Sequence, residues 1–120
     1  MSFQDELKSI CDSSDRFQSA VIMNLDGLVV ARHDARDVEV DIEVLLVELT
    51  ASLKQALQAL DGVEVGELSE FSLDFAKGSL VVRPLKDEHF VALLMAPGAL
   101  TGKGRHALRI HKQPLVKELF

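Results

Sequence analysis

The segment PGALTGKG at residues 97–104 contains the residue types of a phosphate-binding loop, and we expect it to join a strand to a helix. That motif requires Gly or Ala, four further residues, and then Gly-Lys followed by Ser or Thr. Here Pro97 occupies the first position, and Gly104 replaces the hydroxyl residue that would hold magnesium. Because both changes remove something that nucleotide binding needs, the sequence predicts a flexible strand-to-helix turn at this place.

Four histidines, His33, His89, His106 and His111, are the next candidates for a general base or for metal ligands. His106 and His111 are five residues apart, so on a helix they would point about 140° away from each other. Neither has an acidic partner of the HExxH type, and the other two lie in or beside turn-like sequence. We therefore predict surface histidines and no metal site.

Cys11 is the only cysteine, which excludes an intrachain disulfide and a cysteine-rich metal site. Its spacing from Leu7 and Ile10 predicts a buried side chain on a first helix. Ser13 and Ser14 have no base nearby, the nucleophile motif GxSxG is absent, and no pair of carboxylates suits catalysis. The sequence thus predicts no catalytic, cofactor-binding or metal-binding residues, and a protein that is not an enzyme.

The length of 120 residues suits one domain, which we place at residues 1–120. Hydrophobic residues make up 48%, yet no apolar run reaches the roughly 18 to 20 residues of a membrane span. The N-terminus lacks the basic and apolar regions of a signal peptide, so we expect a cytoplasmic location. The net charge of -6 divides into -10 for residues 1–70 (5 Lys and Arg, 15 Asp and Glu) and +4 for residues 71–120 (8 and 4). This acidic majority disfavours nucleic acid as a partner and favours another protein.

The hydrophobic periodicity predicts the element order helix, two strands, helix, three strands, helix. The Asp26-Gly27 pair between two apolar runs is typical of a β-hairpin. Asp61-Gly62 should end the second helix with Gly62 as its left-handed terminal residue, and Pro114 should kink or break the last helix just before it. The expected elements are helices at 3–13, at 38–60 and from residue 101 onward, and strands at 18–25, 28–33, 65–76, 78–86 and 89–96.

The strands differ in their apolar pattern. In the segment 65–76 only the second half alternates, and there Phe71, Leu73 and Phe75 share a face. Nearly continuous apolar runs, by contrast, indicate strands that are covered on both faces. These runs lie at 20–23, 28–31, 80–82 and 90–96.

The predicted helix at 38–60 carries two opposed apolar stripes when residues are placed about 100° apart. An ordinary surface helix needs only one stripe, so the second requires cover from the rest of the chain or from a partner. The broad stripe, which we assign to the core, contains Ile42, Leu45, Leu46, Leu49, Leu53, Ala56, Leu57 and Leu60. The narrow stripe contains Val40, Val44, Val47 and Ala51 and continues toward Gln55 and Gln58.

With this element order, the sequence resembles roadblock-type domains, the family of the dynein light chain roadblock and of bacterial MglB. The resemblance covers nearly the whole chain. The hairpin followed by a two-faced helix is its most specific part. It is carried by the hairpin AVIMNLDGLVVAR, the long helix at 41–60, the two strands between Gly78 and Ala96, and the last helix beginning LTGKGRHALR.

The resemblance implies an α/β fold of the α+β kind, with a five-stranded antiparallel sheet between the long helix on one face and the terminal helices on the other. It also implies a homodimer, in which the second helices pack together and the third strands pair edge to edge. Family members regulate or scaffold small Ras-like GTPases, and some bacterial ones stimulate GTP hydrolysis by remodelling the GTPase rather than by supplying catalytic residues. The expected dimer or partner interface contains Val40, Val44, Val47, Ala51, Gln55, Gln58, Glu67, Leu68, Glu70 and Ser72.

Two other functions are compatible with the sequence. A small-molecule sensor of the profilin, GAF or PAS kind shares a sheet with flanking helices, and it would need a sizeable internal pocket with converging polar groups. The apolar strands offer few such groups. A purely structural adaptor would share the homodimer but would not affect GTP turnover, and the sequence does not separate it from a regulator.

Overall fold

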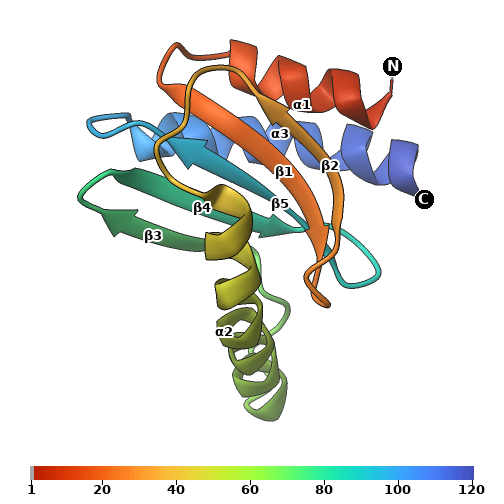
Figure 1. The fold of residues 1–120 in the computed structure, drawn as a ribbon. Helices are drawn as coiled ribbons and strands as arrows, with labels where there is room; N and C mark the ends of the chain where they lie inside the picture. Colours follow the sequence, from red (N-terminus) through yellow and green to blue (C-terminus); the bar gives the residue numbers. More distant parts are fainter. Residues whose placement is uncertain (1) are drawn as a thin grey trace.

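The computed structural model describes residues 2–120, and its helices and strands follow the predicted order. The elements are α1 (Phe3–Asp12), β1 (Phe17–Asn24), β2 (Val29–Asp34), α2 (Ile42–Gly62), β3 (Phe71–Phe75), β4 (Gly78–Pro84), β5 (His89–Met95) and α3 (Thr101–Leu119). All five strands form one antiparallel sheet in the order β2-β1-β5-β4-β3, which leaves β2 and β3 as free edges. Helices α1 and α3 cover one face of the sheet and α2 lies on the other (Figure 1). The predicted fold is confirmed.

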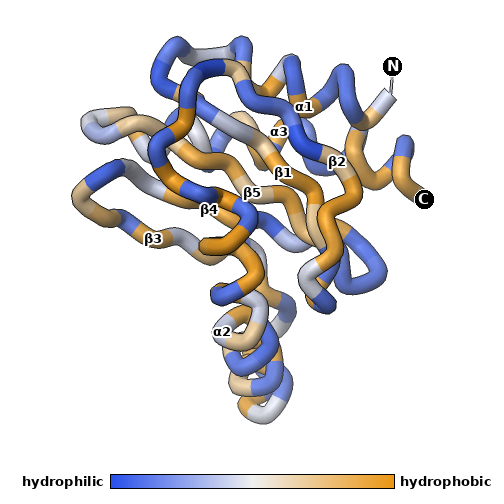
Figure 2. Tube along the Cα trace, viewed as in Figure 1, coloured by the Kyte–Doolittle hydropathy of each residue, from blue (hydrophilic) through white to orange (hydrophobic). Residues whose placement is uncertain are grey.

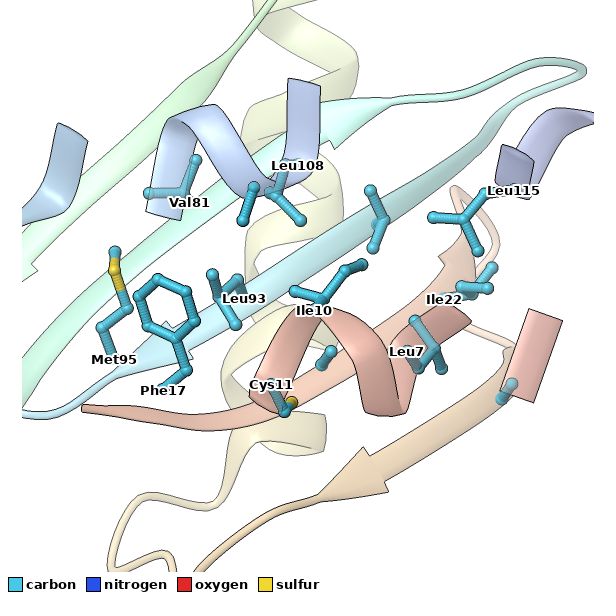
Figure 3. Close-up of a cluster of buried hydrophobic side chains, with 14 residues drawn as sticks. Leu7, Ile10, Cys11, Phe17, Ile22, Val81, Leu93, Met95, Leu108 and Leu115 are labelled. Atoms are coloured by element: carbon cyan, nitrogen blue, oxygen red, sulfur yellow. The ribbon is translucent and has the colours of Figure 1, made fainter. Parts of the chain in front are cut away.

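Two apolar clusters, one on each face of the sheet, form the core. On the α1 and α3 side, Leu7 and Ile10 of α1 pack in one cluster with Leu108 and Leu115 of α3 (Figure 3). On the other side α2 contributes Leu46 to what we call the α2-side cluster. Figure 2 shows apolar residues along β1, β4 and β5, whereas the connection from β2 to α2 is mostly polar. The central strands are therefore covered on both faces, as their continuous apolar runs predict.

The apolar run at 28–31 is the exception, because the prediction that both its faces are covered is wrong. This run enters the edge strand β2, and Leu28, Val29 and Val30 are 65%, 39% and 40% exposed. A β-bulge next to Ile22 leaves Val30 without a partner residue on β1. In this run, the continuous apolar residues belong to the exposed turn and edge strand of a hairpin, and not to a strand covered on both faces.

Helix α2 begins at Ile42, four residues later than predicted. Asp41 is its N-cap, and the Asp41 carboxylate accepts a hydrogen bond from the backbone N–H of Val44 at 3.2 Å. Val38 and Val40 lie in the loop before the helix and pack against the α2-side cluster. These two valines continue the apolar spacing of the helix before the chain has entered it, which explains the early prediction.

The end of α2 also differs from the prediction. Gly62 is still helical, Val63 is the C-cap, and the left-handed residue is Glu64, with a φ of 54°. The chain then has no regular structure through 65–70, so the predicted strand at 65–76 is confirmed only from Phe71 onward. The half that forms a strand is the half whose apolar residues alternate.

Helix α3 runs as one helix through Pro114 to Leu119, so a break at the proline, one of the two predicted outcomes, does not occur. The proline removes one backbone hydrogen bond, which would have gone to the carbonyl of Ile110. Leu115 is fully buried, and Leu119 packs against the cluster shared with α1. Tertiary packing therefore holds the last turns of α3 in place despite the proline.

The buried position of Cys11 is confirmed, and burial raises the pKa of its thiol to about 12. The prediction of a surface His111 is wrong. Its Nδ1 lies 2.7 Å from a carboxylate oxygen of Glu6, and the two side chains are only 16% and 10% exposed. This pair joins α3 to α1. Sequence spacing could not reveal it, because the two residues are 105 positions apart.

Candidate interaction surface on the long helix

The outward side of α2 carries exposed apolar side chains. Val44 and Val47 are 58% and 46% exposed, and Ala51, one turn further on, is exposed as well. Their spacing of three and four residues places them together, and we call them the valine face. Leu46, on the opposite side of the helix, is fully buried. The two opposed apolar sides predicted for this helix are therefore present.

An ion pair shows which flank of α2 faces which edge of the sheet. Nη1 of Arg32, on β2, lies 3.2 Å from a carboxylate oxygen of Glu43 on α2. The flank that contains Glu43 therefore faces the β2 edge. At about 100° per residue, Leu45 and Leu49 lie on the other flank, toward β3.

A second apolar surface lies between that flank and the β3 edge. Leu45 and Leu49 are only half-buried and pack against the α2-side cluster. Leu73 of β3 pairs with Leu80 of β4, a member of this cluster, so the apolar side chains of β3 point to the α2 face. They too are only half-buried. We call this surface the β3 flank: Leu45, Leu49, Phe71, Leu73 and Phe75.

The apolar side chains of β3 were not among the predicted interface residues, which included only Ser72 from this strand. Their shared face is confirmed by the register of β3 with β4. The alternation of apolar and polar residues in the sequence was the available signal. It places Phe71, Leu73 and Phe75 on one face of an edge strand, and an apolar face of this kind needs another surface to cover it.

The remaining predicted interface residues are dispersed. Val40 and Leu68 are half-buried against the α2-side cluster, so they belong in part to the core. Four others are exposed: Gln55 and Gln58 on α2, Glu67 in the connection after it, and Ser72 on β3.

Glu70 is occupied by contacts within the chain. Its carboxylate lies 3.5 Å from Arg83 and 2.5 Å from Arg105, and its side chain is 16% exposed. Arg105 belongs to α3, so Glu70 points away from the α2 side of the sheet. Of the predicted interface, the structure thus brings together Val44, Val47, Ala51, Gln55 and Gln58 on one helix.

An open cleft of 580 Å³ lies beside the C-terminal half of α2. Its lining is mainly apolar, and its carboxylate groups are on exposed residues at the rim. Within residues 2–120, no group of three or more His, Cys, Asp and Glu side chains could hold a metal ion. None of the described helices is long and apolar enough to cross a membrane.

No protein-family model and no curated protein sequence matches this chain. Solved structures do match it over nearly its whole length. MglC from Myxococcus xanthus has a TM-score of 0.70 and 27% identity, covering 98% of this chain and 99% of that chain. A Roadblock/LC7 domain from Streptomyces avermitilis has a TM-score of 0.82 and 14% identity, covering 99% and 98%. The gliding protein MglB from Thermus thermophilus has a TM-score of 0.78 and 12% identity, covering 96% and 89%.

Proposed function

The chain is a roadblock-type, MglB-like domain, and from this we propose that it is a homodimer that regulates or scaffolds a small Ras-like GTPase without catalytic residues of its own. The observation that carries the proposal is the apolar surface left uncovered on α2 and beside it on β3. It lies in two separate places, the valine face and the β3 flank. Two surfaces suit two partners, a second copy of the chain and a GTPase.

The β3 flank is the surface that suits the second copy. Strand β3 is a free edge, and an unpaired edge readily pairs with another strand. Pairing β3 with the same strand of a second copy would extend the sheet across a twofold axis. The β3 flanks of both copies would then meet, and each would cover the half-buried Leu73 and its neighbours of the other.

The valine face alone is too small to hold a dimer. A dimer on this face would bury Val44 and Val47 of both copies. Full burial of a valine is worth about 1.5 kcal/mol, but only about half of each side chain is still exposed, so the four together would contribute about 3 kcal/mol. Association costs about 4 to 15 kcal/mol. The β3 flank adds five larger apolar side chains and the backbone hydrogen bonds of a strand pair. We therefore assign the dimer to the β3 flank and the valine face to the GTPase.

A protein without catalytic groups can still change GTP turnover. It does so if it binds one conformation of the GTPase more tightly than another, because the binding free energy then shifts the population toward that conformation. In the proposed dimer the valine face of each copy remains exposed, flanked by charged residues such as Glu48 and Lys54. These charges would steer and orient the GTPase.

The test uses purified small Ras-like GTPases from the same source as this protein. Binding by calorimetry and GTP turnover are measured with the parent protein, with Val44→Asp combined with Val47→Asp, and with Ile110→Asp as the control. Ile110 is an exposed apolar residue on α3, across the sheet from α2. The proposal expects binding by the parent and the control and loss of binding by the valine variant.

If none of the GTPases binds the parent protein, the proposal is wrong. Binding with altered turnover identifies a regulator, and binding without any change in turnover identifies a scaffold.

A further inference from the structure

We propose that the cleft beside the C-terminal half of α2 binds an extended polypeptide segment whose apolar side chains are flanked by Lys or Arg. This goes beyond GTPase regulation, because the cleft is separate from the valine face and its ligand need not be a GTPase. Its volume of 580 Å³ lies within the range of about 300 to 1,000 Å³ that is usual for ligand sites.

The floor of the cleft is apolar. Because side chains alternate along an extended chain, every second residue of a bound segment would point toward this floor. Leu60 belongs to neither core cluster, so no side chain of the core covers the part of the floor that Leu60 forms. The apolar lining includes Leu25, Leu53, Leu57, Leu60, Val82 and Phe90.

The rim is strongly acidic. The cleft lining also contains two basic side chains, Lys86 and His89, and both of them contact the ring of Phe120. Nζ of Lys86 lies 5.9 Å from the centre of the Phe120 ring, and the His89 ring centre lies 5.2 Å from it. The negative charge of the rim carboxylates favours a ligand that carries Lys or Arg. The rim carboxylates, all on exposed residues, are Asp61, Glu64, Glu67, Asp87 and Glu88.

Backbone groups beside the cleft favour a polypeptide over a small organic cation. Residues 65–70 have no regular structure, and they take part in none of the backbone hydrogen bonds found outside helices and strands among the described residues. Their N–H and C=O groups can therefore pair with an extended chain. Helix α3 of a second copy also carries positive charge, with five Lys and Arg against one Glu. It fits less well, because its backbone groups are already paired within the helix.

The backbone conformation of the rim also supports a role for its carboxylates in binding. Three non-glycine residues among those described have a positive φ, and all three are rim carboxylates: Glu64 at 54°, Asp87 at 53° and Glu88 at 62°. Glycine adopts such angles with less strain. Carboxylate side chains therefore occupy these positions at a conformational cost.

The test measures fluorescence anisotropy of a fluorescein-labelled octapeptide of alternating Leu and Lys as the parent protein is added. Octapeptides of alternating Leu and Glu, and of alternating Ser and Lys, show whether the charge and the apolar side chains are both needed. The proposal expects binding of the Leu and Lys peptide only. Equal binding of all three peptides, or no binding of the first, would overturn it.

Charge variants locate the binding. Asp61→Lys combined with Glu67→Lys reverses two rim charges, and Glu39→Lys combined with Glu48→Lys reverses two exposed charges that do not line the cleft. Both proteins have the same net charge, so a general charge effect cancels between them. The rim variant should weaken binding by about tenfold or more and the control by less than about twofold. Equal weakening would overturn the proposal.

Two further measurements address the floor and the second copy. Leu60→Ser should weaken binding by about tenfold without unfolding the protein, because Leu60 lies outside the core clusters. Sedimentation of the same samples shows whether the peptide binds without changing the oligomeric state, as expected. Binding that occurs only when copies separate would show that a second copy fills the cleft, which would overturn the proposal.

Discussion

A carbon at the Cβ position of Gly27 would lie 3.7 Å from Cγ2 of Val47, so the tip of the β1–β2 hairpin touches the valine face of α2. Gly27 has a φ of 85°, a conformation that suits glycine. The next residue, Leu28, is 65% exposed. The hairpin tip therefore extends the valine face, and a partner that binds this face is expected to contact Leu28 as well. The opposite flank of α2 faces β3.

The first prediction concerns the core side of α2. Sequence spacing treats Leu46 and Leu49 alike, but Leu46 is fully buried and Leu49 is half-buried. Leu46→Ala should lower the free energy of unfolding by about 3 kcal/mol, and Leu49→Ala by about 1 kcal/mol. Urea denaturation of the two variants measures both values. Equal losses would show that α2 packs on the sheet differently from this structure.

The second prediction concerns Gly104, which together with Pro97 departs from the phosphate-loop motif. A Cβ at this position would lie 2.5 Å from Sδ of Met95 and 3.3 Å from Cδ2 of Leu93, so a side chain here would force the buried Met95 side chain to move. Gly104→Ser, which restores the hydroxyl residue of the motif, should lower stability by about 1 to 3 kcal/mol. It should also leave the protein unable to bind ATP or GTP. Gly102→Ser is the matched control, since nothing lies near that position.

The third prediction concerns the link between α1 and α3. Glu6→Leu and His111→Leu should each lower the free energy of unfolding by about 1 to 3 kcal/mol, because each leaves the polar group of the other residue buried without its partner. Lys8→Ala serves as the control. Its ion pair with Asp12 is exposed, and removing such a pair costs less than about 1 kcal/mol. Thermal denaturation followed by circular dichroism compares the three variants; if His111→Leu matches Lys8→Ala, the buried pair contributes nothing.

The fourth prediction concerns Cys11. Burial raises the pKa of its thiol from 9.0 to about 12, so the thiol stays protonated and should resist iodoacetamide at pH 8 until the chain unfolds. Above pH 9 the thiol ionises in the unfolded chain but not in the folded one. This contribution to stability is therefore complete below pH 9 and is lost as the pH rises toward 12. Mass spectrometry of native and urea-unfolded protein checks the labelling, and rapid labelling of the native protein would contradict it.

The predictable features of this fold are local ones. The Asp26-Gly27 turn and the two apolar sides of α2 follow from residue spacing over a few positions. Features set by distant residues were missed. The contact between Glu6 and His111 spans nearly the whole chain, and the continuity of α3 beyond Pro114 depends on packing against other elements.

In the candidate site, too, the local features were predictable from the sequence and the features set by distant residues were not. Spacing identified the valine face, because Val44, Val47 and Ala51 repeat at helical intervals. It did not show which flank of the helix faces which edge of the sheet. That required the pairing of Arg32 with Glu43, which joins β2 to α2.

The central claim is that β3 flanks hold two copies together while the valine face stays free. Light scattering of the parent protein, Leu73→Asp and Val47→Asp tests it most directly, since Leu73 lies outside the core clusters and Val47 is 46% exposed. We predict twice the 13.2 kDa chain mass for the parent and for Val47→Asp, and the mass of a single chain for a folded Leu73→Asp. A monomeric parent protein, or a Val47→Asp variant that is monomeric while Leu73→Asp remains a dimer, would contradict the claim.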